Sequence, residues 1–320
     1  MAAPQNRTLT LTASDQKKYS RRLFRLHQPA SLPDILNRTI HQDLFQAIPF
    51  LPDAFVDLLF LDPPYNLTKT FGRTLFKSSS AQSYEAWLES WFPKLMRMLK
   101  PAASVYLCGD WRTSGALQRV AERYLTVRNR ITWEREKGRG AQRNWKNASE
   151  DIWFCTAAEK FTFNASAVKL RRRVLAPYRS NGAPKDWSST DAGNFRETFA
   201  SNLWTDISVP FWSMPENTAH PTQKPEKLLA KLILASSNAG EVVFDPFLGS
   251  GTASVVAKKL GRHFVGIEQE LPFACLAEKR LALAEGDKSI QGYTHDDTSG
   301  VFWERNSLSH RKKILRDAGL

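Results

Sequence analysis

Apolar and polar positions along the chain follow the periods of helices and strands over most of its length. Short apolar runs such as Val56 to Leu61 are typical of strands covered on both faces of a parallel sheet. The strands expected on this ground lie at residues 56–61, 104–108, 127–133, 151–157, 241–245 and 263–268. Apolar residues at helical spacing predict helices at residues 83–100, 117–125, 225–236, 252–260 and 271–284, with a short one at 43–48. This alternation predicts a doubly wound α/β sheet.

Three segments do not follow this alternation. Residues 1–35 are polar and basic, and we expect an arm or a loosely attached helix outside the core. Residues 165–215 carry many cations, prolines and serines, which indicates an insertion between the two halves of the sheet. Residues 286–320 form a polar tail with a basic cluster at 310–313, for which the pattern predicts no structure.

Composition describes a folded protein that is attracted to polyanions. With 320 residues, of which 42% are hydrophobic and 24% charged, the chain can form one large α/β domain or two ordinary ones. The formal net charge of +13 favours a polyanionic partner, most commonly nucleic acid, although an anionic membrane surface would attract it equally.

The cysteines and the hydropathy pattern indicate the compartment. Cys108, Cys155 and Cys275 are odd in number and far apart, which fits neither a disulfide framework nor a CxxC metal site. The N-terminal segment has no apolar leader, and no stretch approaches the ~18 consecutive apolar residues of a membrane span. We therefore expect a cytoplasmic protein without a membrane-spanning segment.

A glycine turn connects two of the expected elements. One strand ends at Asp245, the chain passes Gly249 and Gly251 into a helix, and the next strand ends at Glu268. Glycines let a ligand approach the backbone, and an acid about 20 residues further on can bind ribose hydroxyls. The pattern predicts a nucleotide-binding βαβ unit, although a glycine turn alone also occurs where any strand turns tightly into a helix.

The ligand of this turn is expected to be a nucleoside without phosphates. Ala253 and Ser254 stand where the dinucleotide pattern requires its third glycine, which disfavours NAD or FAD. S-adenosylmethionine fits, with its adenosine at the sheet edge near Glu268 and its amino-acid end near the turn.

The sequence DPPY at residues 62–65 follows the strand expected at 56–61. A parallel strand would bring Asp62 to the carboxyl edge of the sheet, where open α/β proteins bind ligands. Pro63 and Pro64 lack amide donors, so their carbonyls can face a ligand as acceptors, and Tyr65 offers a ring on which a base can stack. Such a site suits an exocyclic NH2 group on a heteroaromatic ring. The same letters also occur in simple strand-ending turns, but the glycine turn downstream favours the chemical interpretation.

Together these motifs resemble the S-adenosylmethionine-dependent amino-methyltransferases of DNA, specifically the permuted beta class of N6-adenine enzymes. The resemblance covers residues 37–284, and its motifs occur in the order DPPY (62–65), NLW (202–204), HPTQKP (220–225) and DPFLGSGT (245–252). It implies a Rossmann-like methyltransferase sheet with an inserted target-recognition region. The implied parts are an arm (1–35), a catalytic half (36–164), the insertion (165–215), a cofactor-binding half (216–285) and a tail (286–320).

The resemblance also implies roles for single residues. Asp43 matches an acid that contacts the cofactor adenine, Asp62 and the Pro63 carbonyl match the acceptors of the target amine, and Tyr65 matches the stacking residue. His220, Thr222 and Lys224 lie in the segment that approaches the methionine part of the cofactor, although HPTQKP also resembles an ordinary helix start. The remaining implied cofactor contacts are Asp245, Pro246, Phe247, Gly249, Ser250, Gly251, Thr252 and Glu268.

The expected reaction is methyl transfer to the N6 amine of an adenine flipped out of duplex DNA. The aspartate that opens DPPY favours adenine within the family, but cytosine N4 stays open because both amines present the same N–H groups. No metal is required. Cations in the loop after residue 133 and in the insertion are expected to contact DNA phosphates. They are Arg135, Lys137, Arg139, Arg143, Lys146, Lys169, Arg171, Arg172 and Arg173.

Several alternatives stay open at this point. An RNA methyltransferase would use the same basic loops, and only the order of the motifs favours DNA. A DNA-binding protein that has lost catalysis is the other alternative, which the intact motifs disfavour. Within the family a homodimer is frequent, and a cognate restriction endonuclease acting on the same site is a further candidate partner.

Overall fold

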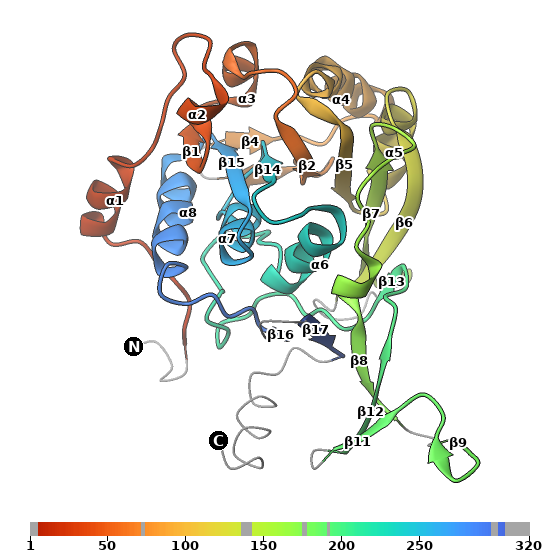
Figure 1. The fold of residues 1–320 in the computed structure, drawn as a ribbon. Coiled ribbons are helices and arrows are strands. Elements are labelled where there is room, and N and C mark those ends of the chain that lie inside the picture. Colours follow the sequence, from red (N-terminus) through yellow and green to blue (C-terminus); the bar gives the residue numbers. More distant parts are fainter. Residues whose placement is uncertain are drawn as a thin grey trace.

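The computed structural model describes residues 6–71, 74–135, 143–174, 178–190, 193–295 and 300–304. Its main feature is an eight-stranded sheet in the order β1-β15-β14-β2-β5-β7-β6-β13 (Figure 1). In that order the strands span Arg38–His41, His263–Glu268, Val242–Asp245, Val56–Leu61, Leu99–Gly109, Ser149–Thr156, Thr126–Glu134 and Leu203–Trp204. Strand β7 runs antiparallel to both of its neighbours, whereas the other pairs in this sheet are parallel.

Helices cover both faces of this sheet, as the doubly wound prediction requires. Alternate residues of β2 enter opposite cores, because Leu59 packs with α4 and α5 whereas Leu58 packs with α6 and α7. The helices are α1 (Ala13–Ser20), α2 (Leu32–Ile35), α3 (Leu44–Ala47), α4 (Ala81–Met96), α5 (Ser114–Glu122), α6 (Glu226–Ser236), α7 (Thr252–Lys259) and α8 (Leu271–Leu283), with 3-10 turns η1 (Ile48–Phe50) and η2 (Ala165–Val168). The α/β class and the elements expected from the apolar pattern are therefore confirmed.

The expectation that residues 1–35 lie outside the core is wrong. Leu26 and Ile35 are buried in the core on the α4 side of the sheet. The preceding helix α1 packs on α8, where Lys279 Nζ lies 2.8 Å from Asp15 Oδ2. Strand β1, which the apolar pattern did not predict, extends the sheet by pairing with β15.

The insertion forms a second sheet, and the C-terminal tail belongs to the same sheet. Its order is β11-β12-β8-β17-β16, and it lies at the lower end of the molecule in Figure 1. These strands span Ser188–Thr190, Gly193–Thr198, Leu170–Arg173, Gly300–Trp303 and Tyr293–His295. Two small hairpins complete the strands, β3 (Lys69–Phe71) with β4 (Thr74–Phe76) and β9 (Arg179–Ser180) with β10 (Ala183–Pro184). The basic cluster at 310–313 lies outside the described residues.

Buried charges attach this second sheet to helix α6. Asp206 Oδ2 lies 2.6 Å from Lys227 Nζ, and Asp206 Oδ1 lies 2.7 Å from Lys231 Nζ. Lys227 also donates to the carbonyl of Trp303 in β17. The end of the insertion and the tail are thus held on the same helix that covers the main sheet.

Three further features of the described residues concern the cysteines, metal-ligating side chains and helix hydropathy. Cys108, Cys155 and Cys275 are buried free thiols. Across the described ranges, no cluster of His, Cys, Asp or Glu side chains could hold a metal ion. None of the helices in those ranges combines the length and apolarity that crossing a membrane requires.

Candidate active site

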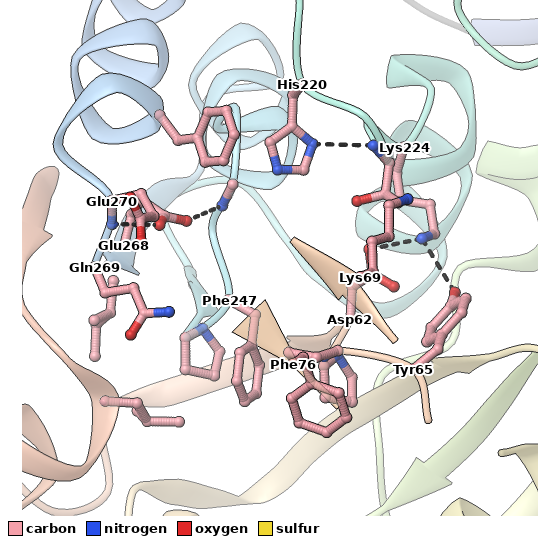
Figure 2. A pocket seen from close by; sticks show the side chains of 18 of the residues that line it. Asp62, Tyr65, Lys69, Phe76, His220, Lys224, Phe247, Glu268, Gln269 and Glu270 are labelled. Carbon is pink, nitrogen blue, oxygen red and sulfur yellow. Dashed lines mark hydrogen bonds and ion pairs between the residues drawn. The ribbon is translucent and has the colours of Figure 1, made fainter. Parts of the chain in front are cut away.

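A cavity of about 330 Å³ lies at the carboxyl edge of the main sheet and is lined by both sequence motifs. Strands β2 and β14 are parallel neighbours, with Leu58 opposite Val243, so the residues that follow each strand meet at one edge. Asp62 to Tyr65 line one part of the cavity, and Pro246, Phe247 and Gly249 line another. Figure 2 shows Asp62, Tyr65 and Lys224 on one side and Glu268 to Glu270 on the other. The predicted juxtaposition of DPPY and the glycine turn is confirmed.

The carboxylate of Asp62 uses only one of its oxygens. Oδ2 accepts a hydrogen bond of 2.6 Å from Lys224 Nζ. Oδ1 is buried and has no hydrogen-bond partner among the residues that the structure describes. Because a buried acceptor without a partner is costly, this oxygen is suited to bind an N–H group of a ligand. Of the two proline carbonyls, that of Pro64 accepts a bond of 3.0 Å from Tyr84 Oη.

Tyr65 is held by a group of charged residues. Its hydroxyl donates a hydrogen bond of 3.0 Å to Glu150 Oε2 and lies 3.2 Å from Lys224 Nζ. Burial, reinforced by the charge of Asp62, raises the pKa of Tyr65 well above its usual value, so the hydroxyl remains protonated. Arg135 pairs with the other carboxylate oxygen of Glu150. The ring of Tyr65 therefore has a fixed orientation at the cavity wall.

The glycine turn and the strand after it form the opposite wall. Gly249 has φ +54°, and a Cβ there would lie 2.9 Å from His220 Nε2. Its amide donates a hydrogen bond of 2.8 Å to Glu268 Oε2, and the amide of Glu270 donates one of 2.7 Å to Glu268 Oε1. Burial raises the pKa of Glu268 to about 7, although these two amide donors favour the ionised form.

His220 is neutral in this environment. Burial lowers its pKa to about 3, and the positive charge of Lys224 acts in the same direction. Its Nδ1 accepts a bond of 3.4 Å from the amide of Thr222, and its ring lies 4.5 Å from that of Phe273. The imidazole can accept a hydrogen bond or pack against a ligand, but it carries no charge near neutral pH.

The other residues predicted to bind the cofactor occupy different positions. Asp43 lines the cavity and caps α3 by accepting a bond of 2.9 Å from the amide of Phe45. A second small cavity is lined by Asp245, Ser250 and Thr252 together with His220 and Lys224. Burial raises the pKa of Asp245 well above its usual value, while its Oδ1 accepts a bond of 3.0 Å from the amide of Phe247.

Gly251 serves packing rather than the wall of the cavity. It has φ +84°, and a Cβ there would lie 2.6 Å from Ala277 Cβ in α8. The sequence predicts that both glycines of the turn let a ligand approach the backbone. The structure distinguishes them, because Gly249 lines the cavity whereas Gly251 allows α7 to begin against α8.

The residues predicted to contact DNA are dispersed. Arg135 lies in the cavity wall, whereas Arg143 and Lys146 are exposed beyond it. Lys137 and Arg139 lie outside the described residues. Lys169 and the run from Arg171 to Arg173 belong to or adjoin strand β8, so this run is part of a sheet rather than a solvated loop. In this run, Arg171 pairs with Glu197 at 2.6 Å and Arg173 is exposed. The Nε atom of Arg172 is buried and has no hydrogen-bond partner among the described residues.

Several cavity residues were missed by the sequence analysis. The most important is Glu150, which is 2% exposed and contacts Tyr65, Lys224 and Arg135. A signal was present, because Glu150 is an acid at the start of an apolar strand. In an antiparallel strand such as β7, the first residues lie at the edge where the parallel strands end. The remaining missed lining residues include Lys69, Phe76, Trp87, Gln269, Glu270 and Phe273.

Comparison with known proteins gives consistent relatives. A family model for N6 and N4 enzymes, described as DNA methylase, matches residues 56–279. The Type II methyltransferase M.HpaI of Haemophilus parainfluenzae is 32% identical over 263 residues, which cover 81% of this chain and 77% of that protein. The DNA adenine methyltransferase YhdJ of Escherichia coli (strain K12) is 31% identical over 264 residues, which cover 80% and 86%.

Solved structures support the fold. The cytosine-N4-specific PvuII DNA methyltransferase superposes with a TM-score of 0.56 at 15% identity, covering 78% of this chain and 92% of that one. The structure of M1.HpyAVI in complex with SAM superposes with a TM-score of 0.50 at 22% identity, covering 76% and 98%.

Proposed function

The chain belongs to the DNA methylase family whose model it matches, and we propose that it transfers a methyl group from S-adenosylmethionine to the exocyclic N6 amine of adenine in double-stranded DNA. The observation that carries this proposal is that one cavity brings the glycine turn together with Asp62 Oδ1, a buried oxygen without a hydrogen-bond partner among the residues that the structure describes. The relative from Escherichia coli, which is named as an adenine methyltransferase, supports adenine as the target.

The residues on the far wall fit S-adenosylmethionine. When bound, this cofactor supplies a methyl group on a positively charged sulfur. The space above Gly249, which a Cβ would fill, allows a ligand to approach the backbone. The carboxylates of Glu268 and Asp43 can accept hydrogen bonds from the ribose hydroxyls and the adenine amine, respectively. The amino-acid end would lie toward Asp245 and Thr252, which line a smaller cavity that shares His220, Lys224 and Gly249 with the main one.

Asp62, Pro63 and Tyr65 act on the target base in this proposal. An aromatic amine is a poor nucleophile because its lone pair is delocalised into the ring. Hydrogen bonds from its two N–H groups to Asp62 Oδ1 and to the Pro63 carbonyl would favour a tetrahedral nitrogen and stabilise the positive charge that forms as the N–C bond is made and the bond between the methyl carbon and sulfur breaks. The methylated nitrogen then loses one proton, and Asp62 Oδ1 is placed to receive it. Stacking on Tyr65 contributes ~1–3 kcal/mol to holding the base.

The base must leave the duplex to reach this site. Asp62 and Tyr65 lie in a cavity at the end of a buried strand, and an amine within stacked DNA cannot approach them. Flipping the nucleotide out costs a few kcal/mol. Exposed cations such as Arg143 and Lys146, which follow the cavity residue Arg135 in sequence, would bind the phosphates of the surrounding duplex.

Product analysis tests the proposed reaction. Plasmid DNA is incubated with the protein and methyl-labelled S-adenosylmethionine, digested to nucleosides and analysed by mass. N6-methyladenine is the expected product. N4-methylcytosine would instead establish the second candidate target, which presents the same N–H groups. Label found only in duplex RNA, or no label in any polymer, would refute DNA methylation.

The role of Asp62 is tested by substitution. Asp62→Ala removes the acceptor and should abolish transfer, while the dissociation constant of the cofactor changes little because the glycine turn is unaltered. Asp53→Ala is the matched control, since Asp53 is an exposed aspartate whose ion pair with Arg97 lies on the surface. Full activity of Asp62→Ala would remove the proposed acceptor role.

Other features of the proposal concern class and context. The beta-class assignment rests on the order of the motifs, and the family supports DNA as the substrate. A homodimer, a cognate restriction endonuclease and a cytoplasmic location stay predictions. Sedimentation of the purified protein would test the homodimer, and localisation in cells would test the cytoplasmic location.

A further inference from the structure

Lys224 lies in the amine site rather than facing only the glycine turn. Its sequence context suggested a contact with the methionine part of the cofactor. In the structure, its ammonium group lies 2.6 Å from Asp62 Oδ2, 3.2 Å from Tyr65 Oη and 3.5 Å from Glu150 Oε2. It also lies 5.3 Å from the centroid of the Tyr65 ring (Figure 2).

We propose that Lys224 and Glu150 form a positioning pair that holds Asp62 and Tyr65 in the geometry that receives the target amine. The pair acts through these two residues and does not itself touch the reacting atoms. This inference rests on the proposed methyl transfer to an exocyclic amine.

The hydrogen-bond capacity of Lys224 supports this role. An ammonium group has three N–H donors, and three acceptor oxygens surround it within ion-pair or hydrogen-bond distance. Two of these donors make hydrogen bonds to Asp62 and Tyr65 and the third faces the carboxylate of Glu150 at ion-pair distance, so the ammonium group is directed toward these three residues. Its backbone is fixed as well, since the Lys224 carbonyl accepts a bond of 3.0 Å from Thr252 Oγ1 at the start of α7.

The arrangement leaves one oxygen of Asp62 available for the target. Lys224 binds Oδ2, while Oδ1 is buried and has no hydrogen-bond partner within the described part of the chain. A carboxylate held at one oxygen cannot rotate freely, so the direction of the other oxygen is fixed. The target N–H would therefore meet an acceptor that needs no reorganisation, which is the condition for strong electrostatic stabilisation of a transition state.

Glu150 balances the positive charge that Lys224 brings into the site. A lone ammonium beside Asp62 would oppose the positive charge that develops on the amine nitrogen. Glu150 is buried, pairs with Arg135 and accepts a hydrogen bond from the Tyr65 hydroxyl. Asp62 and Glu150 carry two negative charges and Lys224 and Arg135 two positive ones, so this group is neutral as a whole.

Further groups face Asp62 from the surrounding elements. The charged and titratable ones come from strands β3, β5 and β14 and from helix α4. They are Lys69, Cys108, Asp245 and Tyr84.

The test compares Lys224→Met with Lys224→Arg and Glu150→Gln in the full-length protein. Single-turnover methyl transfer is measured at saturating S-adenosylmethionine, and cofactor affinity is measured separately by calorimetry. Lys224→Met should slow transfer on the order of 100-fold, a typical loss for one electrostatic group of an active site, with the cofactor dissociation constant changed less than about threefold. Lys224→Arg keeps the charge and should recover part of the rate. Lys258→Met is the matched control, because Lys258 does not line the cavity and pairs with the exposed Glu285.

The split between rate and affinity separates positioning from a general structural effect. Lys224→Met should lower the transfer rate at saturating S-adenosylmethionine and leave the cofactor dissociation constant nearly unchanged, whereas a variant with a distorted site should change both. Glu150→Gln should slow transfer and leave cofactor affinity unchanged.

Distinct outcomes would overturn the inference or the proposal beneath it. If Lys224→Met weakens cofactor binding more than about tenfold and transfers at the normal rate at saturation, Lys224 is a cofactor contact and the inference is wrong. If the wild type methylates DNA and both Lys224→Met and Glu150→Gln do so at its rate, the inference alone fails. If the wild type transfers no methyl group to DNA, the proposed function fails as well. Should Lys224→Met not fold, Lys224→Arg and Glu150→Gln decide the question by the same measurements.

Discussion

The need for glycine at position 251 can be measured against a control at the other end of the same helix. Gly251 precedes α7 with φ +84°, and an added Cβ would lie 2.6 Å from Ala277 Cβ and 2.9 Å from its Cα. Gly261 follows α7 with φ +73°, and nothing lies within 4 Å of an added Cβ. The substitutions Gly251→Ala and Gly261→Ala therefore share the backbone strain and differ in the collision with α8.

The two contributions to the free energy of unfolding can be separated by this comparison. A left-handed backbone costs a residue with a Cβ roughly 1–2 kcal/mol, which is the loss expected for Gly261→Ala. Overpacking against a helix that cannot easily move adds about 1–3 kcal/mol. Gly251→Ala should thus lose roughly 2–5 kcal/mol, because the atoms that the new methyl group would meet include the Ala277 backbone.

Urea denaturation of the wild type and both variants gives the difference directly, provided that the slopes agree. Calorimetry with S-adenosylmethionine then shows whether the displaced turn still binds the cofactor, and we expect weaker binding for Gly251→Ala alone. Equal losses of stability in the two variants would refute the packing explanation. A stable Gly251→Ala that no longer binds the cofactor would show that this glycine serves the ligand and not the helix contact.

Two further predictions concern buried charges. Burial raises the pKa of the Glu268 carboxyl from 4.5 to about 7. The contribution of this group to the free energy of unfolding is therefore fully present below its pKa in the unfolded chain and is lost as the pH rises through 7. Ribose hydroxyls donate hydrogen bonds to the ionised form of Glu268, so cofactor affinity measured by calorimetry should increase roughly tenfold between pH 6 and 8 in the wild type. In Glu268→Gln the affinity should not change with pH. A wild-type affinity that does not change with pH would contradict this role. Asp206→Ala leaves Lys227 and Lys231 buried without their carboxylate and should cost about 3–5 kcal/mol in urea denaturation. Asp186→Ala removes an exposed aspartate and should cost at most about 1 kcal/mol, and similar losses for the two would argue against the buried cluster as the attachment of the second sheet.

Local pattern determined much of the main sheet. Strands β2 and β15 occupy the residues expected from their apolar runs, because a strand buried on both faces needs apolar side chains at nearly every position. The DPPY and glycine motifs were found for the same reason: each follows a strand whose position was readable, and parallel strands end at one edge of a sheet. The sequence could therefore predict that Asp62 and Gly249 share a site.

The partners within that site could not be read in the same way. Asp62 and Lys224 are 162 residues apart, and Tyr65 and Glu150 are 85 apart. No local periodicity encodes such pairs, because each depends on where helices and strands pack after the chain has folded. The sequence motif predicted a cofactor contact for Lys224, whereas packing of the segment before α6 directs its ammonium group to Asp62 and Tyr65.

The order of the amino acids by itself determined the α/β class, the position of most strands and helices, and the chemistry of the two motifs, because burial and turn geometry act over neighbouring residues. Only the tertiary structure decided that the N-terminal segment enters the core, that the tail completes the sheet of the insertion, and that Lys224 binds Asp62 while Glu150 binds Tyr65. These features arise from contacts between segments that are distant in the sequence. The partners of a polar side chain in such a contact are set by the packing of the folded chain and not by its neighbours in the sequence.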